Sequence, residues 1–227
     1  MFNLNDLTFR QANISDAEGI KQVYLDSEVE KQQIDSIIKE QKECFSGIFK
    51  IPDVKEMLED QSIEFLVACQ EDGEIIAFTS WQNNTTSLDH AWQLQTDFNN
   101  KINDLKQKEE IGSVLDVVTK KKFRSHGIGT KLYELMFKSF LKKSKSHALI
   151  EIYTIKEILN NNKKIITKIE SPNCSQNYQC LLTGAKLIGE VKRPLQAVVN
   201  FPGFVAVQAN IFLAKTNFIF ASNSSKK

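Results

Sequence analysis

The chain has 227 residues, 41% hydrophobic and 25% charged, with a net charge of +1 at pH 7. This length can bury a sizeable core and favours one domain with insertions over two. The balanced charge gives no reason to expect nucleic acid or a membrane surface as a partner, and no apolar run approaches the ~20 residues that span a bilayer. The four cysteines lack Cys-x-x-Cys spacing, and the first residues lack the features of a signal peptide. We therefore expect a cytoplasmic protein with reduced thiols and no metal site.

The first half of the chain predicts a strand, a helix and a hairpin. Residues 7–12 form a short strand pattern, and a helix follows from residue 16, with Asn13 or Ser15 as its N-cap and with Ser15 and Glu18 as a capping box. Residues 64–69 and 74–81 are apolar runs on either side of an Asp-Gly turn, which is a strong hairpin signal.

Two longer segments interrupt these elements. Residues 26–62 carry two helical patterns, centred on Ile34–Ile38 and Val54–Leu58. Residues 83–111 are rich in Asn, Gln and Lys, and we expect an inserted helix there. Long connections of this kind serve as lids or oligomer contacts more often than as idle loops, so a homodimer interface is one reading of the insertion.

Residues 113–119 predict a strand and residues 131–141 predict a helix, with two glycines in the loop that joins them. Such a loop suits phosphate, because glycine lets the backbone approach closely and the amides of the first helical turn point outward. A Walker loop would end in Gly-Lys-Ser/Thr, and the order here is Gly129-Thr130-Lys131. A dinucleotide fingerprint would need a third glycine where Leu132 stands.

The second half of the chain predicts further strands. Residues 146–164 match a helical stripe, although Leu149–Ile155 also fits a buried strand; we expect an added helix there and place a fifth strand at residues 164–170. A helix pattern then ends at Gly184, and residues 187–191 and 204–213 read as two closing strands. Residues 216–227 are expected to be a C-terminal tail.

The loop resembles the acetyl-CoA pyrophosphate loop of the GNAT superfamily of N-acetyltransferases. It contains Arg-x-x-Gly-x-Gly from Arg124 to Gly129, after a strand and at the start of a helix. A second match runs from Asn173 to Gly184, which resembles the family pattern after the fifth strand. The resemblance covers most of residues 7–214. It implies one domain over residues 1–215 with an α+β, three-layer fold, in which helices flank a twisted, mostly antiparallel mixed sheet of about seven strands.

The resemblance also implies an activity: direct transfer of an acetyl group from acetyl-CoA to an amine. The backbone of the fourth strand would meet the acetyl carbonyl and the pantetheine arm, with the Val117 amide as oxyanion donor. The loop would hold the pyrophosphate, and Asn173 would contact the cofactor or cap its helix. The cofactor-binding residues implied in this way are Val117, Val118, Thr119, Arg124, Ser125, His126, Gly127, Ile128, Gly129, Thr130 and Asn173.

The acid and the base are less well defined by the resemblance. Cys180 stands where the family often has a tyrosine that protonates the leaving thiolate, and either a proton donor or a buried helix residue fits this position. Ser113 stands where some members carry a catalytic glutamate, so this base is absent here, and the resemblance then implies a water chain that acts on the amine. Asp116 is a candidate base because a carboxylate within an apolar strand is unusual and its burial would raise its pKa, but strand alternation directs it to the face opposite Val117. Two other functions stay open: CoA binding without catalysis, and acyl transfer to a protein or transfer RNA.

Overall fold

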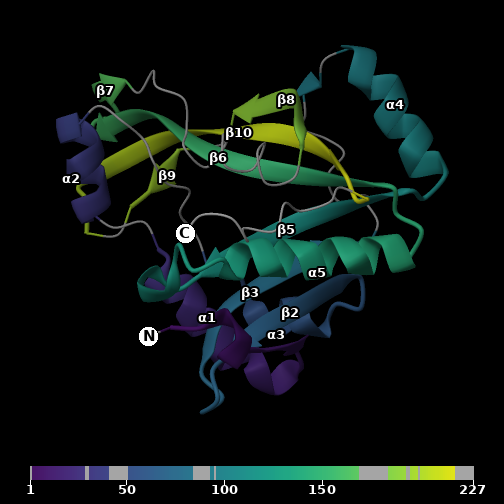
Figure 1. Cartoon of the computed structure of the whole chain (residues 1–227). Coiled ribbons are helices and arrows are strands. Elements are labelled where there is room, and N and C mark those ends of the chain that lie inside the picture. Colours follow the sequence, from purple (N-terminus) through teal and green to yellow (C-terminus); the bar gives the residue numbers. More distant parts are fainter. Residues whose placement is uncertain are drawn as a thin grey trace, which may run out of the picture.

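A single mixed sheet organises the protein. The computed structural model describes residues 2–28, 31–40, 51–83, 93–94, 96–168, 184–192, 195–198 and 200–217. The strand order is β1-β2-β3-β5-β6-β10-β8-β4, with β7 paired to β6 and β9 paired to β10 (Figure 1). All neighbouring pairs are antiparallel except β5 and β6, which run parallel. The predicted mixed, mostly antiparallel sheet is therefore confirmed.

The described elements include ten strands and five α-helices. The sheet has ten described strands, more than the about seven that were predicted, and β4, β7 and β9 are short strands paired to β8, β6 and β10. The strands are β1 Thr8–Gln11, β2 Ile63–Cys69, β3 Ile75–Gln82, β4 Gln93–Leu94, β5 Ile111–Thr119, β6 His147–Asn160, β7 Ile165–Lys168, β8 Lys186–Lys192, β9 Gln196–Ala197 and β10 Gly203–Lys215. The helices are α1 Ala17–Asp26, α2 Lys31–Glu40, α3 Val54–Glu59, α4 Thr96–Gln107 and α5 Ile128–Lys142.

The helices cover the two faces of the sheet unequally. On β3, Ala77 packs into the cluster that contains α5, whereas its neighbour Phe78 packs against α1 and α3. On β6, Ile150 faces the α5 cluster and Leu149 faces α4. Because side chains alternate along a strand, α5 covers one face and α1, α3 and α4 cover the other. Figure 1 shows α4 and α2 near opposite ends of the β6–β10 pair, where each has its own apolar cluster.

The predicted hairpin and the inserted helix are both confirmed. Strands β2 and β3 pair in antiparallel register across a turn in which Gly73 has a φ of +86°, a conformation that glycine adopts without a steric cost. Helix α4 lies within the predicted insertion at residues 83–111. None of the described helices is long and apolar enough to cross a membrane.

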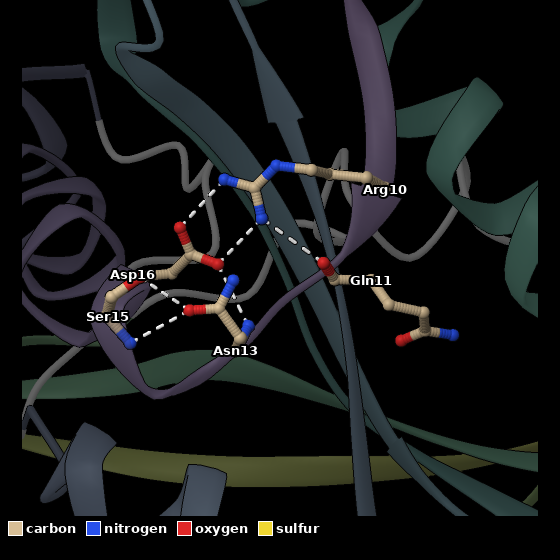
Figure 2. A network of polar contacts seen from close by, with 5 residues as sticks. All are labelled: Arg10, Gln11, Asn13, Ser15 and Asp16. Atoms are coloured by element: carbon tan, nitrogen blue, oxygen red, sulfur yellow. Dashed lines mark hydrogen bonds and ion pairs between the residues drawn. The ribbon is translucent and has the colours of Figure 1, made fainter.

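A polar network joins β1 to the start of α1, and its capping pair differs from the predicted one. Asn13 and Asp16 form the capping box, in place of Ser15 and Glu18. Arg10 donates from both terminal nitrogens to the Asp16 carboxylate, at 2.7 and 2.8 Å (Figure 2). This ion pair holds the pKa of Asp16 below its usual range. Of the two predicted N-caps, Asn13 is confirmed, and the Ser15–Glu18 box is wrong because a 3-10 turn at Ile14–Asp16 precedes the α-helix and begins two residues earlier than expected.

The helix predicted within residues 146–164 is wrong, because this segment forms the 14-residue strand β6. Apolar residues occur on both faces of β6, which is covered by α5 on one side and by α2 and α4 on the other. A strand buried on both faces has apolar residues at nearly every position, so a helical spacing can be selected from it by chance. The predicted fifth strand at 164–170 is the short strand β7, which pairs with the far end of β6. The parallel neighbour of β5 is β6 itself.

Candidate active site

The strand–loop–helix unit forms as the sequence predicts. Strand β5 ends at Thr119, a short 3-10 turn covers Lys121–Phe123, and α5 begins at Ile128. Gly127 is the N-cap of α5 with a φ of +82°, and no side chain caps this end of the helix. A Cβ placed on Gly129 would meet nothing within 4 Å, so the space beside the first turn is open. A 15-residue helix with an uncapped, accessible N-terminus is a suitable place for an anion.

Side chains fix the loop to the end of β5. The Arg124 Nε donates to the Thr119 carbonyl at 3.1 Å, and Ser27 Oγ at the end of α1 donates to the same oxygen at 3.3 Å. Burial lowers the pKa of the Arg124 guanidinium, which stays charged in proteins. The ring of His126 packs edge-on against Phe2, with ring centroids 4.7 Å apart. The loop therefore has a defined shape before any ligand arrives.

The sheet opens beside β5. The parallel register of β5 with β6 runs only from Ile111 to Val114, and Leu115, Asp116 and Val117 beyond it are half-buried. The Lys120 amide donates to the Ile76 carbonyl of β3 at 2.9 Å. Successive amides of a strand point to opposite sides, so the amides of Val117 and Thr119 point away from β3, toward the opening. Within the described residues, no strand pairs with this side of β5 after Val114.

Asp116 lies on the opposite face of the sheet from the Val117 side chain, as predicted. Its Oδ2 accepts hydrogen bonds from the Tyr24 hydroxyl at 2.7 Å and from Ser80 Oγ at 3.2 Å. Burial raises the pKa of the Asp116 carboxyl, and these two hydrogen bonds oppose that rise. Burial and the nearby Asp116 charge raise the pKa of Tyr24 as well, so its hydroxyl remains a donor across the physiological range.

The structure brings together two of the predicted groups of site residues. Residues 116–119 and residues 124–130 lie on adjoining segments, at the end of β5 and the start of α5. Asn173 and Cys180, and the helix predicted around them, lie outside the described residues. Lys120 is the first of three consecutive lysines before the loop, and it forms an ion pair with Glu74 at 2.7 Å.

Tyr24 and Ser80 were not predicted as part of the site. Tyr24 belongs to the buried stripe of α1, where a tyrosine reads as one more apolar residue. One signal was present, because a buried tyrosine usually needs a partner for its hydroxyl. The partner is Asp116, 92 residues further along the chain, and the sequence does not show that the two residues meet.

The comparisons with known proteins agree with this architecture. Residues 34–163 match the Acetyltransferase (GNAT) family. An N-acetyltransferase from Staphylococcus aureus Mu50 superposes with a TM-score of 0.53 and 10% identity, covering 92% of this chain and 98% of that one. The ribosomal-protein-S18-alanine N-acetyltransferase from Escherichia coli gives 0.51 and 11%, covering 97% and 99%. A GCN5-related N-acetyltransferase from Kribbella flavida gives 0.51 and 13%, covering 94% and 99%.

No curated protein matches the sequence significantly. At 10–13% identity, the structural neighbours show the shared fold alone. The family match covers more than half of the chain and contains β5, the loop and α5. The chain therefore belongs to the GNAT family of acetyltransferases.

Proposed function

We propose that the protein transfers an acetyl group from acetyl-CoA to a primary amine, by direct attack of the amine on the thioester in a ternary complex. One observation carries this proposal: the open edge of β5 runs directly into the uncapped N-terminus of α5. A donor that has an acyl group at one end and a pyrophosphate further along fits such an arrangement, because backbone donors are available at both places.

The backbone supplies most of the proposed contacts with the donor. The amides around Gly127 and Gly129 hold the pyrophosphate, with Arg124, Ser125, His126, Ile128 and Thr130 completing the loop. The main chain of Val117, Val118 and Thr119 runs beside the pantetheine arm. The Val117 amide donates to the carbonyl oxygen as negative charge develops on it in the tetrahedral intermediate. Helix N-terminus and amides are preorganised, so little rearrangement is needed when the donor binds.

Two further roles follow from the sequence resemblance. Asn173 contacts the cofactor, and Cys180 gives a proton to the departing thiolate of CoA. A cysteine thiol, whose pKa is about 8.5 in water, has an acidity comparable to that of the thiol it would protonate. Cys180→Ala tests this role directly: acetyl transfer should slow while affinity for CoA stays unchanged.

Release of free thiol from acetyl-CoA, measured with spermidine, tyramine and a peptide with a free N-terminus, tests the reaction itself. We expect thiol release that depends on the amine, together with the acetylated amine by mass spectrometry. Tight binding of CoA without turnover on amines, peptides or transfer RNA would reduce the function to cofactor binding. Turnover restricted to peptide or transfer RNA would instead identify a macromolecular acceptor.

A further inference from the structure

A group of polar side chains lies on the α1–α4 face of the sheet, between two apolar clusters. Along β5, Ile111 belongs to the α4 cluster and Val118 to the α1 cluster, and Ser113 and Asp116 lie between them. Ser113 is 1% exposed, and its Oγ has no hydrogen-bond partner among the described residues. Buried polar atoms are nearly always paired in native proteins, so an unpaired one in this position points to a missing polar partner.

The hydrogen bonds of Asp116 are unevenly distributed. Both Tyr24 and Ser80 donate to Oδ2, and the described residues give Oδ1 no partner. These donors come from α1 and from the neighbouring strand β3, so the carboxyl group is held from two sides. A carboxylate has about four acceptor positions, and two of them are used here. The remaining oxygen is available to a donor from outside the described chain.

Asp116 is also next to the proposed site of reaction. The following residue is Val117, whose amide points into the opening between β5 and β6. The side chain of Asp116 leaves the strand toward the α1–α4 face, and the amide of Val117 lies in the plane of the sheet. A group that approaches the opening from the α1–α4 face therefore meets the carboxylate beside the proposed oxyanion donor.

We propose that Asp116 binds the ammonium group of the acceptor and removes its proton, and that Tyr24 and Ser80 are positioning residues for this carboxylate. The inference rests on the proposed acetyl transfer and names its acceptor class: a primary amine that is cationic in water. An ammonium group has three donors and no acceptor. One of its donors can satisfy Oδ1 of Asp116, and Ser113 lies on the same face of β5.

The proton balance of the step is complete. The ammonium group gives one proton to the carboxylate, which leaves a neutral amine and a carboxylic acid. The amine nitrogen attacks the thioester carbon, the C–S bond breaks, and the CoA thiolate takes a proton from Cys180, which regains one from solvent. The new amide loses the second proton of the amine to solvent, and Asp116 returns its own proton to solvent to restore the carboxylate.

The environment of Asp116 sets the direction of the pH dependence. The groups that act on this carboxyl are Tyr24 on α1 and Ser80 on β3, and no charged side chain of the described elements contributes. Burial raises its pKa and the two hydrogen bonds lower it. The carboxylate is the active form, so activity falls as pH drops through the pKa. Removal of the Tyr24 hydroxyl should raise that pKa further and move the acidic limb of the profile to higher pH.

Carbon-13 NMR of the Asp116 carboxyl, with Asp116→Asn for assignment, tests the contact without relying on turnover. Spermidine, tyramine and a free-N-terminus peptide are titrated separately into the CoA-saturated protein. We expect at least one amine to shift the Asp116 resonance and lower its pKa, because a bound cation favours the carboxylate. No shift with any of the three would overturn the inference, and CoA saturation in the same sample tests the donor site separately.

Kinetic comparison of variants tests the proton transfer. Asp116→Asn should lower kcat/KM by roughly 100-fold or more with a cationic amine, and by much less with an aromatic amine that is already neutral at pH 7. Tyr24→Phe should keep activity at high pH and shift the acidic limb upward. Asp72→Asn makes the same chemical change in the exposed β2–β3 turn and should leave the profile unchanged. An equal loss with both amines, or an unshifted limb in Tyr24→Phe, would show that these residues serve structure alone.

Discussion

Replacement of Gly129 by alanine separates the fold of the phosphate loop from its binding role. The added methyl group meets no protein atom within 4 Å, and the residue lies in the first turn of α5, so the fold gains helix propensity and loses nothing. We expect a stabilisation of up to about 1 kcal/mol, which corresponds to roughly 2–4 °C in Tm for a chain of this size. The same methyl group occupies the space proposed for the pyrophosphate. Loss of one charge-assisted hydrogen bond, worth about 1.5–3 kcal/mol, should weaken CoA binding by roughly 10- to 150-fold.

Calorimetric titration of CoA and a thermal melt of the free protein measure the two effects. Gly73→Ala is the matched control, because Gly73 also has open space around it but adopts a positive φ in the β2–β3 turn. This control should lower Tm through backbone strain and leave CoA affinity unchanged. Unchanged CoA affinity in Gly129→Ala, together with an equal or higher Tm, would show that the phosphates do not bind at the start of α5.

Substitutions at three other positions have defined outcomes. In denaturant titrations at pH 7, Asp16→Asn should lower the free energy of unfolding by about 1–3 kcal/mol. Arg10 holds the pKa of Asp16 below the ordinary aspartate value of 3.8. The difference in stability from the wild-type protein should therefore shrink as pH falls below 3.8. In calorimetric titrations, Arg124→Gln should weaken CoA binding by about tenfold, because one charged hydrogen-bonding group is lost. Arg124→Lys keeps the charge but loses the Nε donor to Thr119, so its CoA affinity should lie between those of the wild-type protein and Arg124→Gln. Gly112→Ala should destabilise the protein by about 1–3 kcal/mol, because the new Cβ would stand 2.2 Å from a ring atom of α5; an unchanged melting curve would contradict this packing.

The parts of the fold that the sequence predicts well are those with local causes. The turn at Asp72–Gly73 needs a positive φ, and the two apolar strands beside it can only pair with one another in an antiparallel hairpin. The start of α5 is also local, because Gly127 alone supplies the left-handed N-cap and the helical stripe follows at once. These signals need no knowledge of distant residues.

The incorrect or missing predictions depend on partners far away in the sequence. Strand β6 is a strand because both of its faces are covered and because it pairs with β5 and β10. The hydrophobic periodicity of residues 146–164 carries no information about these distant partners. The pairing of Tyr24 with Asp116 likewise joins segments 92 residues apart. Strand alternation correctly placed Asp116 opposite Val117, but only the folded sheet shows which hydroxyl groups reach its carboxylate.

A β-bulge in β5 explains how the polar groups of the site come to share one face. Ser80 pairs with Asp116 while Trp81 pairs with Val114, so Leu115 is an extra residue in β5. Without it, a two-residue alternation would direct Val114 and Asp116 to the same face, with Ser113 on the other. With it, Val114 packs against α5, and Ser113 and Asp116 both face α1 and α4. The same bulge lies where β5 leaves β6. A single inserted residue therefore turns the Asp116 carboxylate toward the α1–α4 face at the point where the sheet opens beside Val117.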